Sequence, residues 1–133
     1  GPHRKQRLAE LGSHDVIITT YPLVARDREE LAEIPLHLLV LDEAHAIKTH
    51  DTLAADAVRA LDTRHRVCLS GTPIENHLGE LWSLYAVVFP GLLGGWPQFR
   101  RAHALPIEKQ TDPAAAPALA RVLAPFLLRR TRD

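Results

Sequence analysis

The feature that most constrains the fold of this chain is an apolar run that ends on two adjacent carboxylates. Residues 36–41 read Leu-His-Leu-Leu-Val-Leu and are followed by Asp42 and Glu43. A nearly continuous apolar run of this length is typical of a strand that is covered on both faces, as in a parallel sheet. The sequence therefore predicts a buried strand that brings two acidic side chains to one edge of such a sheet.

Further apolar runs alternate with helical patterns along the chain. The β-branched run 16–20 and the run 67–69 predict two more short strands. The charged, helix-favouring composition of 26–32 predicts a helix there. Apolar spacing predicts helices at 53–61, 78–88 and 119–126, with Pro125 bending or ending the last one. We expect irregular chain from Pro90 through Pro97. The alternation predicts an α/β fold with a parallel sheet, in which 67–69 is outermost, 38–41 lies in the middle and 16–20 lies beyond it.

The composition is typical of a globular protein, and the length is that of about one domain. The chain has 133 residues, of which 46% are hydrophobic and 24% are charged, and it has no apolar run long enough to span a membrane. The single cysteine, Cys68, fits a reducing compartment. Lys and Arg number 16, as do Asp and Glu, which excludes a uniformly basic surface for nucleic acid but not a local basic patch. The excess of arginine over lysine indicates a bacterial source.

The two carboxylates after the predicted strand 36–41 could do chemistry on phosphates. Asp42 could hold a hydrated Mg²⁺ that bridges nucleotide phosphates, and Glu43, which points elsewhere, could deprotonate water. The plainer interpretation is a strand that ends in a solvated acidic turn. His45 and His50 are spaced for neither a helical metal pair nor a His-Glu-x-x-His motif, so we interpret His45 as a polar connector rather than a zinc ligand.

Hydroxyl groups follow the other two predicted strands. Ser70-Gly71-Thr72 comes after 67–69, and Thr19-Thr20-Tyr21-Pro22 comes after 16–20. Hydroxyls and free backbone N–H groups at such an edge can contact nucleic-acid phosphates. A helix cap at Thr72 and a simple turn at Pro22 explain the same residues without any function.

Taken together, these strings resemble the Swi/Snf-type ATPases, a branch of helicase superfamily two. The matches occur in the family's order and cover nearly all of residues 15–131. The segment 39–48 resembles the DEAH or Walker B box, and 69–76 resembles the coupling motif that follows it. Further blocks of the same family are matched by the segments 15–21, 80–84, 89–94 and 125–131.

The resemblance implies a fold, cofactors and roles for the matching residues. The fold would be a partial RecA-like sheet of the P-loop NTPase type, flanked by helices and lacking the phosphate-loop strand. Asp42 would hold Mg²⁺ with bound ATP, Glu43 would activate water, and His45 would relay the nucleotide state to the coupling residues Ser70, Gly71 and Thr72. Double-stranded DNA would lie near Thr20, Tyr21 and Asn76. The parent protein would be an ATP-driven translocase or remodeller in the bacterial cytoplasm, associated with the nucleoid.

Departures from the family pattern suggest a fragment. Neither a Gly-x-x-x-x-Gly-Lys-[Ser/Thr] loop nor a second helicase lobe occurs in the sequence. We therefore expect the chain alone to be inactive and to bind ATP and Mg²⁺ weakly. We interpret residues 1–14 as a protease-site remnant followed by a helical arm, and 15–133 as the C-terminal part of lobe one. A free sheet edge beside 67–69 would favour self-association. The alternative function is a non-catalytic interaction module that retains the fold.

Overall fold

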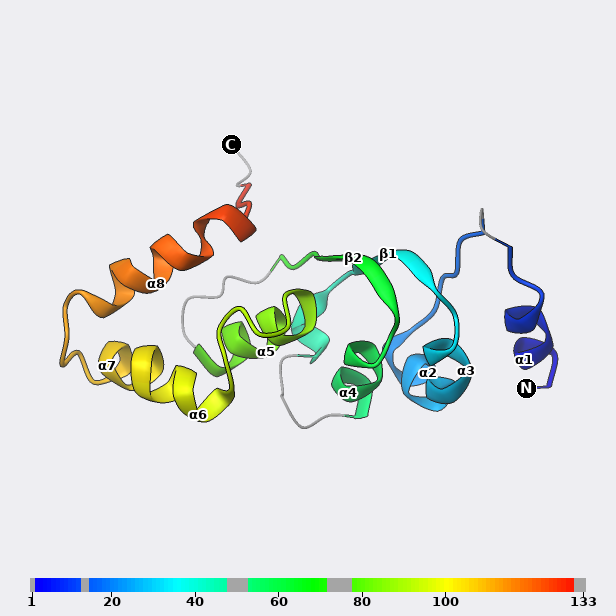
Figure 1. Cartoon of the computed structure of the whole chain (residues 1–133), viewed down its shortest axis with the longest axis horizontal. Coiled ribbons are helices and arrows are strands. Elements are labelled where there is room, and N and C mark those ends of the chain that lie inside the picture. The colour runs from blue at the N-terminus through cyan, green and yellow to red at the C-terminus, as the bar shows by residue number, and fades with distance from the viewer. Residues whose placement is uncertain (1, 13–14, 48–52, 72–77, 131–133) are drawn as a thin grey trace. The chain divides into compact units, whose positions relative to one another are not determined.

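The structure is a computed structural model of the whole chain, and it describes residues 2–12, 15–47, 53–71 and 78–130. The chain divides into two compact units, residues 1–92 and residues 93–133. Figure 1 shows the order of the elements along the chain. Among the described residues, the structure contains no helix that has both the length and the apolar character needed to cross a bilayer.

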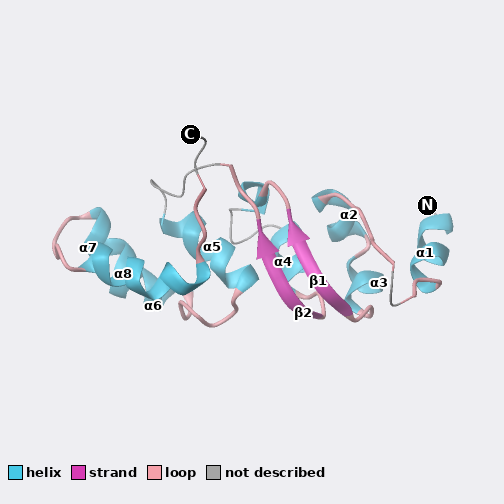
Figure 2. Cartoon of the chain, turned by 90° about the horizontal axis from the view of Figure 1, so that it is seen from above, coloured by secondary structure: helices cyan, strands magenta, loops and turns pink. Residues whose placement is uncertain are grey.

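The first unit is built on two parallel strands, β1 (Leu36–Leu41) and β2 (Thr63–Cys68). The register pairs Leu36 with Thr63 at one end and Leu41 with Cys68 at the other. Helix α4 (Leu53–Arg59) lies on the chain between the two strands and, in Figure 2, behind them. This is the parallel strand–helix–strand arrangement that the alternation predicts, although β2 begins four residues earlier than the apolar run indicates.

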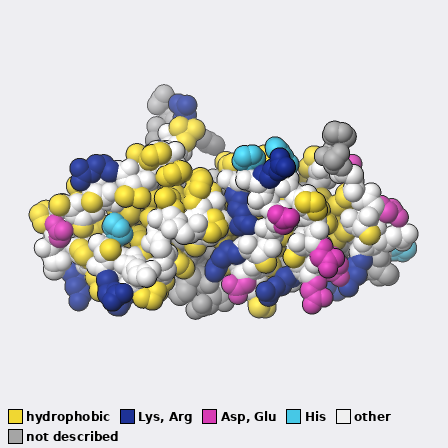
Figure 3. All heavy atoms as spheres, viewed as in Figure 1, with side chains coloured by type: hydrophobic (Ala, Val, Ile, Leu, Met, Phe, Trp, Pro, Cys, Tyr) yellow, Lys and Arg dark blue, Asp and Glu magenta, His cyan; other side chains and the backbone are white. Residues whose placement is uncertain are grey.

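The described part of the first unit contains four further helices. They are α1 (Pro2–Ala9), α2 (Tyr21–Arg26), α3 (Arg28–Ala32) and α5 (Leu78–Val88), and a short 3-10 turn, η1 (Ala44–Ile47), follows β1. Helix α2 begins where Thr20 has an extended backbone and Pro22 occupies the first turn, a position that needs no N–H donor. An ion pair between Lys5 Nζ and Glu30 Oε1, at 2.6 Å, joins α1 to α3. Acidic side chains gather around α3 in Figure 3, and Glu29 and Glu30 lie in the first turn of that helix.

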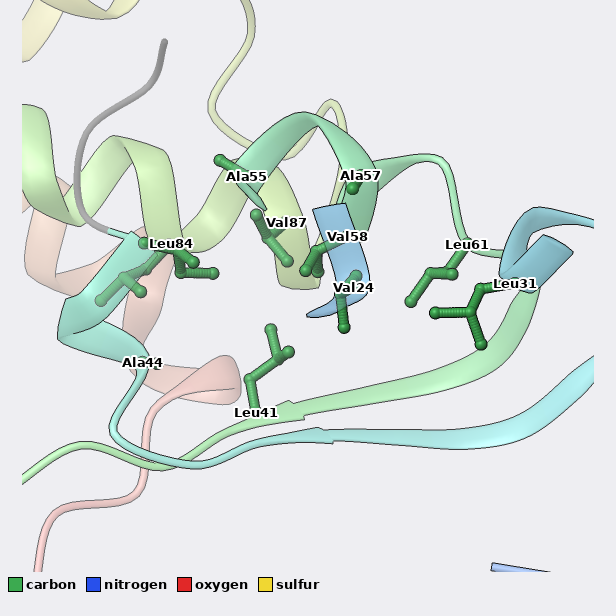
Figure 4. Close-up of a cluster of buried hydrophobic side chains, with 11 residues drawn as sticks. Val24, Leu31, Leu41, Ala44, Ala55, Ala57, Val58, Leu61, Leu84 and Val87 are labelled. Atoms are coloured by element: carbon green, nitrogen blue, oxygen red, sulfur yellow. The ribbon is translucent and has the colours of Figure 1, made fainter. Parts of the chain in front are cut away.

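The core of the first unit lies on one face of the sheet. Leu41 points from β1 toward Val24 and Val58 on the helices, as Figure 4 shows, and is 5% exposed. Leu38 and Val40, on the other face of β1, are each 50% exposed. Within the first unit, none of the described elements lies in front of the strands in Figure 2. The prediction that the strand is covered on both faces is therefore wrong for the part of the chain that the structure describes.

The predicted strand at 16–20 is also absent. Val16 is 83% exposed and Ile18 is 93% exposed, and the segment belongs to no sheet. Consequently the predicted position of 16–20 beside β1 is wrong. β-Branched residues favour an extended backbone, but a strand also needs a hydrogen-bonding partner and a buried face. In this chain the segment leads directly into α2 instead.

The second unit contains a helix of mixed geometry followed by a shorter one. Its first helix runs through α6 (Trp96–Phe99), a π-helical segment η2 (Arg100–Ala104) and α7 (Leu105–Glu108), and it is followed by α8 (Ala115–Leu123) and the 3-10 turn η3 (Ala124–Phe126). The expected irregular chain through Pro97 is thus wrong from Trp96 onward, because proline is tolerated in a first helical turn. The prediction that the last helix ends or bends at Pro125 is confirmed, since α8 gives way to η3 there.

Candidate functional site

Asp42 and Glu43 form an exposed acidic turn directly after β1. The backbone N–H of Glu43 donates to Asp42 Oδ1 at 2.9 Å. Glu43 has a φ of 49°, in the left-handed region that residues other than glycine rarely adopt. The turn therefore holds the Asp42 carboxylate by a local hydrogen bond and redirects the chain at Glu43, while both acidic side chains face solvent.

The acidic turn and the end of β2 lie at the same edge of the sheet. The N–H of Leu69 donates to the carbonyl oxygen of Leu41 at 2.8 Å, and the N–H of Ala44 donates to that of Leu69 at 2.9 Å. Ser70 and Gly71 follow directly and are exposed. The carboxyl ends of parallel strands meet at one edge, which is where α/β proteins place their ligands. The structure thus brings the acidic turn close to the start of the predicted coupling motif.

Tyr21 contacts the acidic turn from a distant part of the sequence. Its hydroxyl donates to the main-chain carbonyl oxygen of Asp42 at 2.6 Å, and its ring is half-buried against the core. Burial raises the pKa of the Tyr21 phenol, and Cys68, Asp42 and Glu43 raise it further. The hydroxyl therefore remains a protonated donor at neutral pH. Sequence reasoning missed this bond, although a tyrosine placed just after a predicted strand was a usable signal.

The other predicted site residues differ in how much the structure describes. Thr20 is exposed and makes no capping hydrogen bond through its side chain. His45 belongs to η1, but the structure describes only its backbone and not its side chain. Thr72 and Asn76 lie outside the described residues. The relay from His45 to Ser70 and Thr72 therefore stays a prediction, as does the contact of Asn76 with DNA.

Arg66 on β2 is a structural arginine that the sequence analysis did not anticipate. Its guanidinium donates to the carbonyl oxygens of Val87 at 2.8 Å, Leu61 at 2.6 Å and Arg59 at 3.3 Å. The carbonyls of Arg59 and Val87 lie in the last turns of α4 and α5, where helix carbonyls lack partners within the helix, and Leu61 lies just after α4. Arg66 thereby ties both helices to the strand that leads to Ser70.

The donor set of the acidic turn fits Mg²⁺. Within the described ranges, no group of three His, Cys, Asp or Glu side chains could hold a metal ion by itself. Mg²⁺ is commonly held by one or two carboxylates together with waters and substrate phosphates, so it does not need such a cluster. Asp42 Oδ1 accepts the Glu43 N–H, and the exposed Asp42 carboxylate is a hard oxygen donor of the kind that this ion prefers.

Two parallel strands joined through a helix, with an acidic turn and a Ser-Gly loop at one edge, define an α/β class of domain. The SNF2-related domain family matches residues 3–133, and the chain belongs to this family. It is 40% identical over 135 residues to the putative ATP-dependent helicase/translocase YwqA of Bacillus subtilis, an alignment that covers 99% of this chain. It is also 40% identical to the TATA-binding protein-associated factor BTAF1 of Arabidopsis thaliana, over 93% of this chain.

Solved structures of the same family have this fold. The Sulfolobus solfataricus SWI2/SNF2 ATPase core in complex with dsDNA matches 91% of this chain with a TM-score of 0.82 and 40% identity. A second structure, of the S. solfataricus SWI2/SNF2 ATPase core domain, matches 92% with a TM-score of 0.78 and 41% identity. The chain spans 25% of each of these cores, 15% of YwqA and 7% of BTAF1. It is thus a fragment of an Snf2-family ATPase domain with a RecA-like α/β fold, as the sequence predicts.

Proposed function

We propose that this chain is the water-activating part of lobe one in a longer ATP-dependent DNA translocase. The observation that carries the proposal is the acidic turn, which holds two exposed carboxylates at the carboxyl end of β1 and beside the end of β2. The family supports ATP as the substrate and Mg²⁺ as its usual companion. The S. solfataricus ATPase core, whose structure was solved in complex with dsDNA, supports duplex DNA as the partner.

The residues of the acidic turn divide the work in this proposal. Asp42, oriented by the N–H of Glu43, would hold Mg²⁺, which when bound neutralises charge on the ATP phosphates. Glu43 would orient a water molecule and accept its proton during attack on the γ-phosphate. The phosphate loop and the second lobe, which the family uses for the other half of the site, would come from other parts of the longer protein.

The remaining predicted residues would connect this chemistry to DNA. Ser70, Gly71 and Thr72 would sense the nucleotide state through His45, since Ser70 and Gly71 follow the strand next to the acidic turn. Thr20, Tyr21 and Asn76 would lie near the DNA backbone. Thr20 is exposed and its hydroxyl makes no capping hydrogen bond to α2, so this hydroxyl could contact a phosphate.

The test is Glu43→Gln in the longer protein. The amide keeps the shape of the side chain but cannot take a proton, so DNA-stimulated ATP hydrolysis should fall by about 10²–10⁴-fold while ATP binding persists. Glu33→Gln is the matched control, because it removes an exposed carboxylate at the end of α3. Normal turnover by the Glu43→Gln protein would exclude Glu43 as the base.

The isolated chain should show no DNA-stimulated ATP hydrolysis. Its sequence contains no Gly-x-x-x-x-Gly-Lys-[Ser/Thr] loop to hold the phosphates. A turnover by the purified chain that Glu43→Gln abolishes would contradict this expectation. If the longer protein bound DNA but hydrolysed no ATP, the alternative of a non-catalytic interaction module would be favoured.

A further inference from the structure

We infer that Tyr21 is a positioning residue through which DNA contact at Thr20 tunes the geometry of the acidic turn. The inference rests on the proposed function and deepens it, because it names a route by which DNA would stimulate ATP hydrolysis. It is carried by one hydrogen bond between segments 21 residues apart, from the Tyr21 hydroxyl to the Asp42 carbonyl oxygen at 2.6 Å.

The carbonyl that Tyr21 contacts belongs to the peptide group between Asp42 and Glu43. The N–H of the same peptide group donates to Asp42 Oδ1 at 2.9 Å. A peptide group is planar, so its carbonyl and its N–H cannot rotate independently. Hydrogen bonds in series also polarise one another. Holding the carbonyl therefore holds the N–H, and with it the carboxylate that is proposed to bind Mg²⁺.

The orientation of this peptide plane also decides where the Glu43 side chain points. The φ of Glu43, 49°, is the rotation about the bond that joins the plane to the Cα atom of Glu43. A tilt of the plane at fixed φ swings the whole side chain. General bases and positioning groups lose efficiency when displaced by as little as about 1 Å. The Tyr21 hydroxyl thus acts on both carboxylates through a single peptide group.

Thr20 and Tyr21 move together because they begin the same helix. The N–H of Val24 donates to the carbonyl oxygen of Thr20 at 2.9 Å, and Val24 itself is buried in the core. The Tyr21 ring packs against that core, whereas Thr20 is exposed. A phosphate bound at Thr20 would act on the start of α2, and the phenol would transmit the shift to the acidic turn.

A purely structural role for Tyr21 makes a different prediction. In that case the hydroxyl only satisfies a carbonyl, and its loss would lower stability without changing how strongly DNA stimulates hydrolysis. The two roles are therefore separated by the ratio of the DNA-saturated turnover rate to the turnover rate without DNA, measured at saturating ATP.

Tyr21→Phe in the longer protein removes the hydroxyl and keeps the ring. We expect the stimulation ratio to fall about 2- to 13-fold, which corresponds to the net free energy that one hydrogen bond contributes. KM for ATP should stay within twofold of the wild type. Tyr85→Phe is the matched control, because it removes the hydroxyl of the chain's other tyrosine, which is buried on α5. Its stimulation ratio should equal that of the wild type.

A double-mutant cycle tests the link to Thr20. Thr20→Val should lower the stimulation ratio as well, and the Thr20→Val/Tyr21→Phe protein should lose less than the product of the two single effects, because both act along one route. A second readout needs no activity: in NMR spectra of the present chain, the amide proton of Glu43 should shift on Tyr21→Phe and stay in place on Tyr85→Phe.

Three results would overturn the inference. They are an unchanged stimulation ratio in Tyr21→Phe, an equal loss in Tyr85→Phe, and multiplicative effects in the double-mutant cycle. Normal turnover by Glu43→Gln would instead refute the proposed function. The shift of the Glu43 amide proton would still report on the contact between Tyr21 and the acidic turn, so the two failures can be told apart.

Discussion

Replacing Arg66 should destabilise the first unit more than any other single loss of charge on β2. Arg66→Met keeps an unbranched stem of similar length but removes the guanidinium, which donates to carbonyl oxygens of Val87, Leu61 and Arg59. Val87 and Leu61 are buried, so water cannot easily replace the lost donor. The carbonyls at the ends of α4 and α5 would then be left without this partner.

The size of the effect follows from the three distances. The bonds at 2.6 and 2.8 Å are well formed, whereas the one at 3.3 Å is weak. Burial removes water from the guanidinium, and this desolvation also lowers the pKa of Arg66. After allowing for the cost of desolvation, each well-formed bond contributes about 1–2 kcal/mol to stability. We expect a loss of about 2–4 kcal/mol in the free energy of unfolding, or roughly 8–30 °C in the Tm of a unit of this size.

The assay should follow the first unit alone. The chain has two tryptophans, Trp82 on α5 in the first unit and Trp96 on α6 in the second. Urea unfolding followed by fluorescence in a Trp96→Phe background therefore reports on the first unit. Arg64→Met is the matched control, because Arg64 lies two residues earlier on β2 and is exposed. Equal losses in Arg66→Met and Arg64→Met would refute the reasoning, since the guanidinium would then contribute nothing beyond its charge.

Two further predictions concern Cys68 and the uncovered face of the sheet. Burial raises the pKa of the Cys68 thiol from 9.0 to about 11. The protonated thiol therefore favours the folded state fully below pH 9, and this contribution is lost as the pH rises toward 11. Between these values Tm should fall further in the wild type than in Cys68→Ala, and equal falls would contradict the assignment. In light scattering over a dilution series, the apparent mass should rise above 14.8 kDa at high concentration. Val67 lies opposite Val40 on the uncovered face and at the predicted free edge, so Val67→Lys should suppress this rise, whereas Leu53→Lys on α4 should not. A monomer at all concentrations would exclude self-association.

Sequence patterns correctly predicted those helices and strands that depend mainly on the side chains of the segment itself. The helix at 78–88 occurs with the predicted bounds, and the run 36–41 forms β1, because apolar periodicity depends only on nearby side chains. The acidic turn at the end of β1 was predicted for the same reason, since the end of an apolar run marks the end of a strand.

Features that depend on distant partners could not be predicted in this way. Residues 63–66 contain two arginines and a histidine, which resemble a loop until α4 and α5 provide carbonyls for Arg66. The run 16–20 has the composition of a strand but no partner in the described sheet. The bond between Tyr21 and Asp42 joins segments that only the topology brings together. Sequence patterns indicate which backbone shape a segment prefers, whereas partners decide whether that preference is realised.

The left-handed backbone at Glu43 opposes stability to the proposed activity at a single position. A φ of 49° costs a side-chain-bearing residue about 1–2 kcal/mol, a cost that glycine avoids and asparagine largely tolerates. Selection for thermal stability alone would therefore drive position 43 toward Gly or Asn. Selection for ATP turnover would retain a carboxylate that the backbone disfavours. Stability-guided redesign of this domain should accordingly hold Glu43 fixed, because the substitution that most improves folding there would also remove the proposed base.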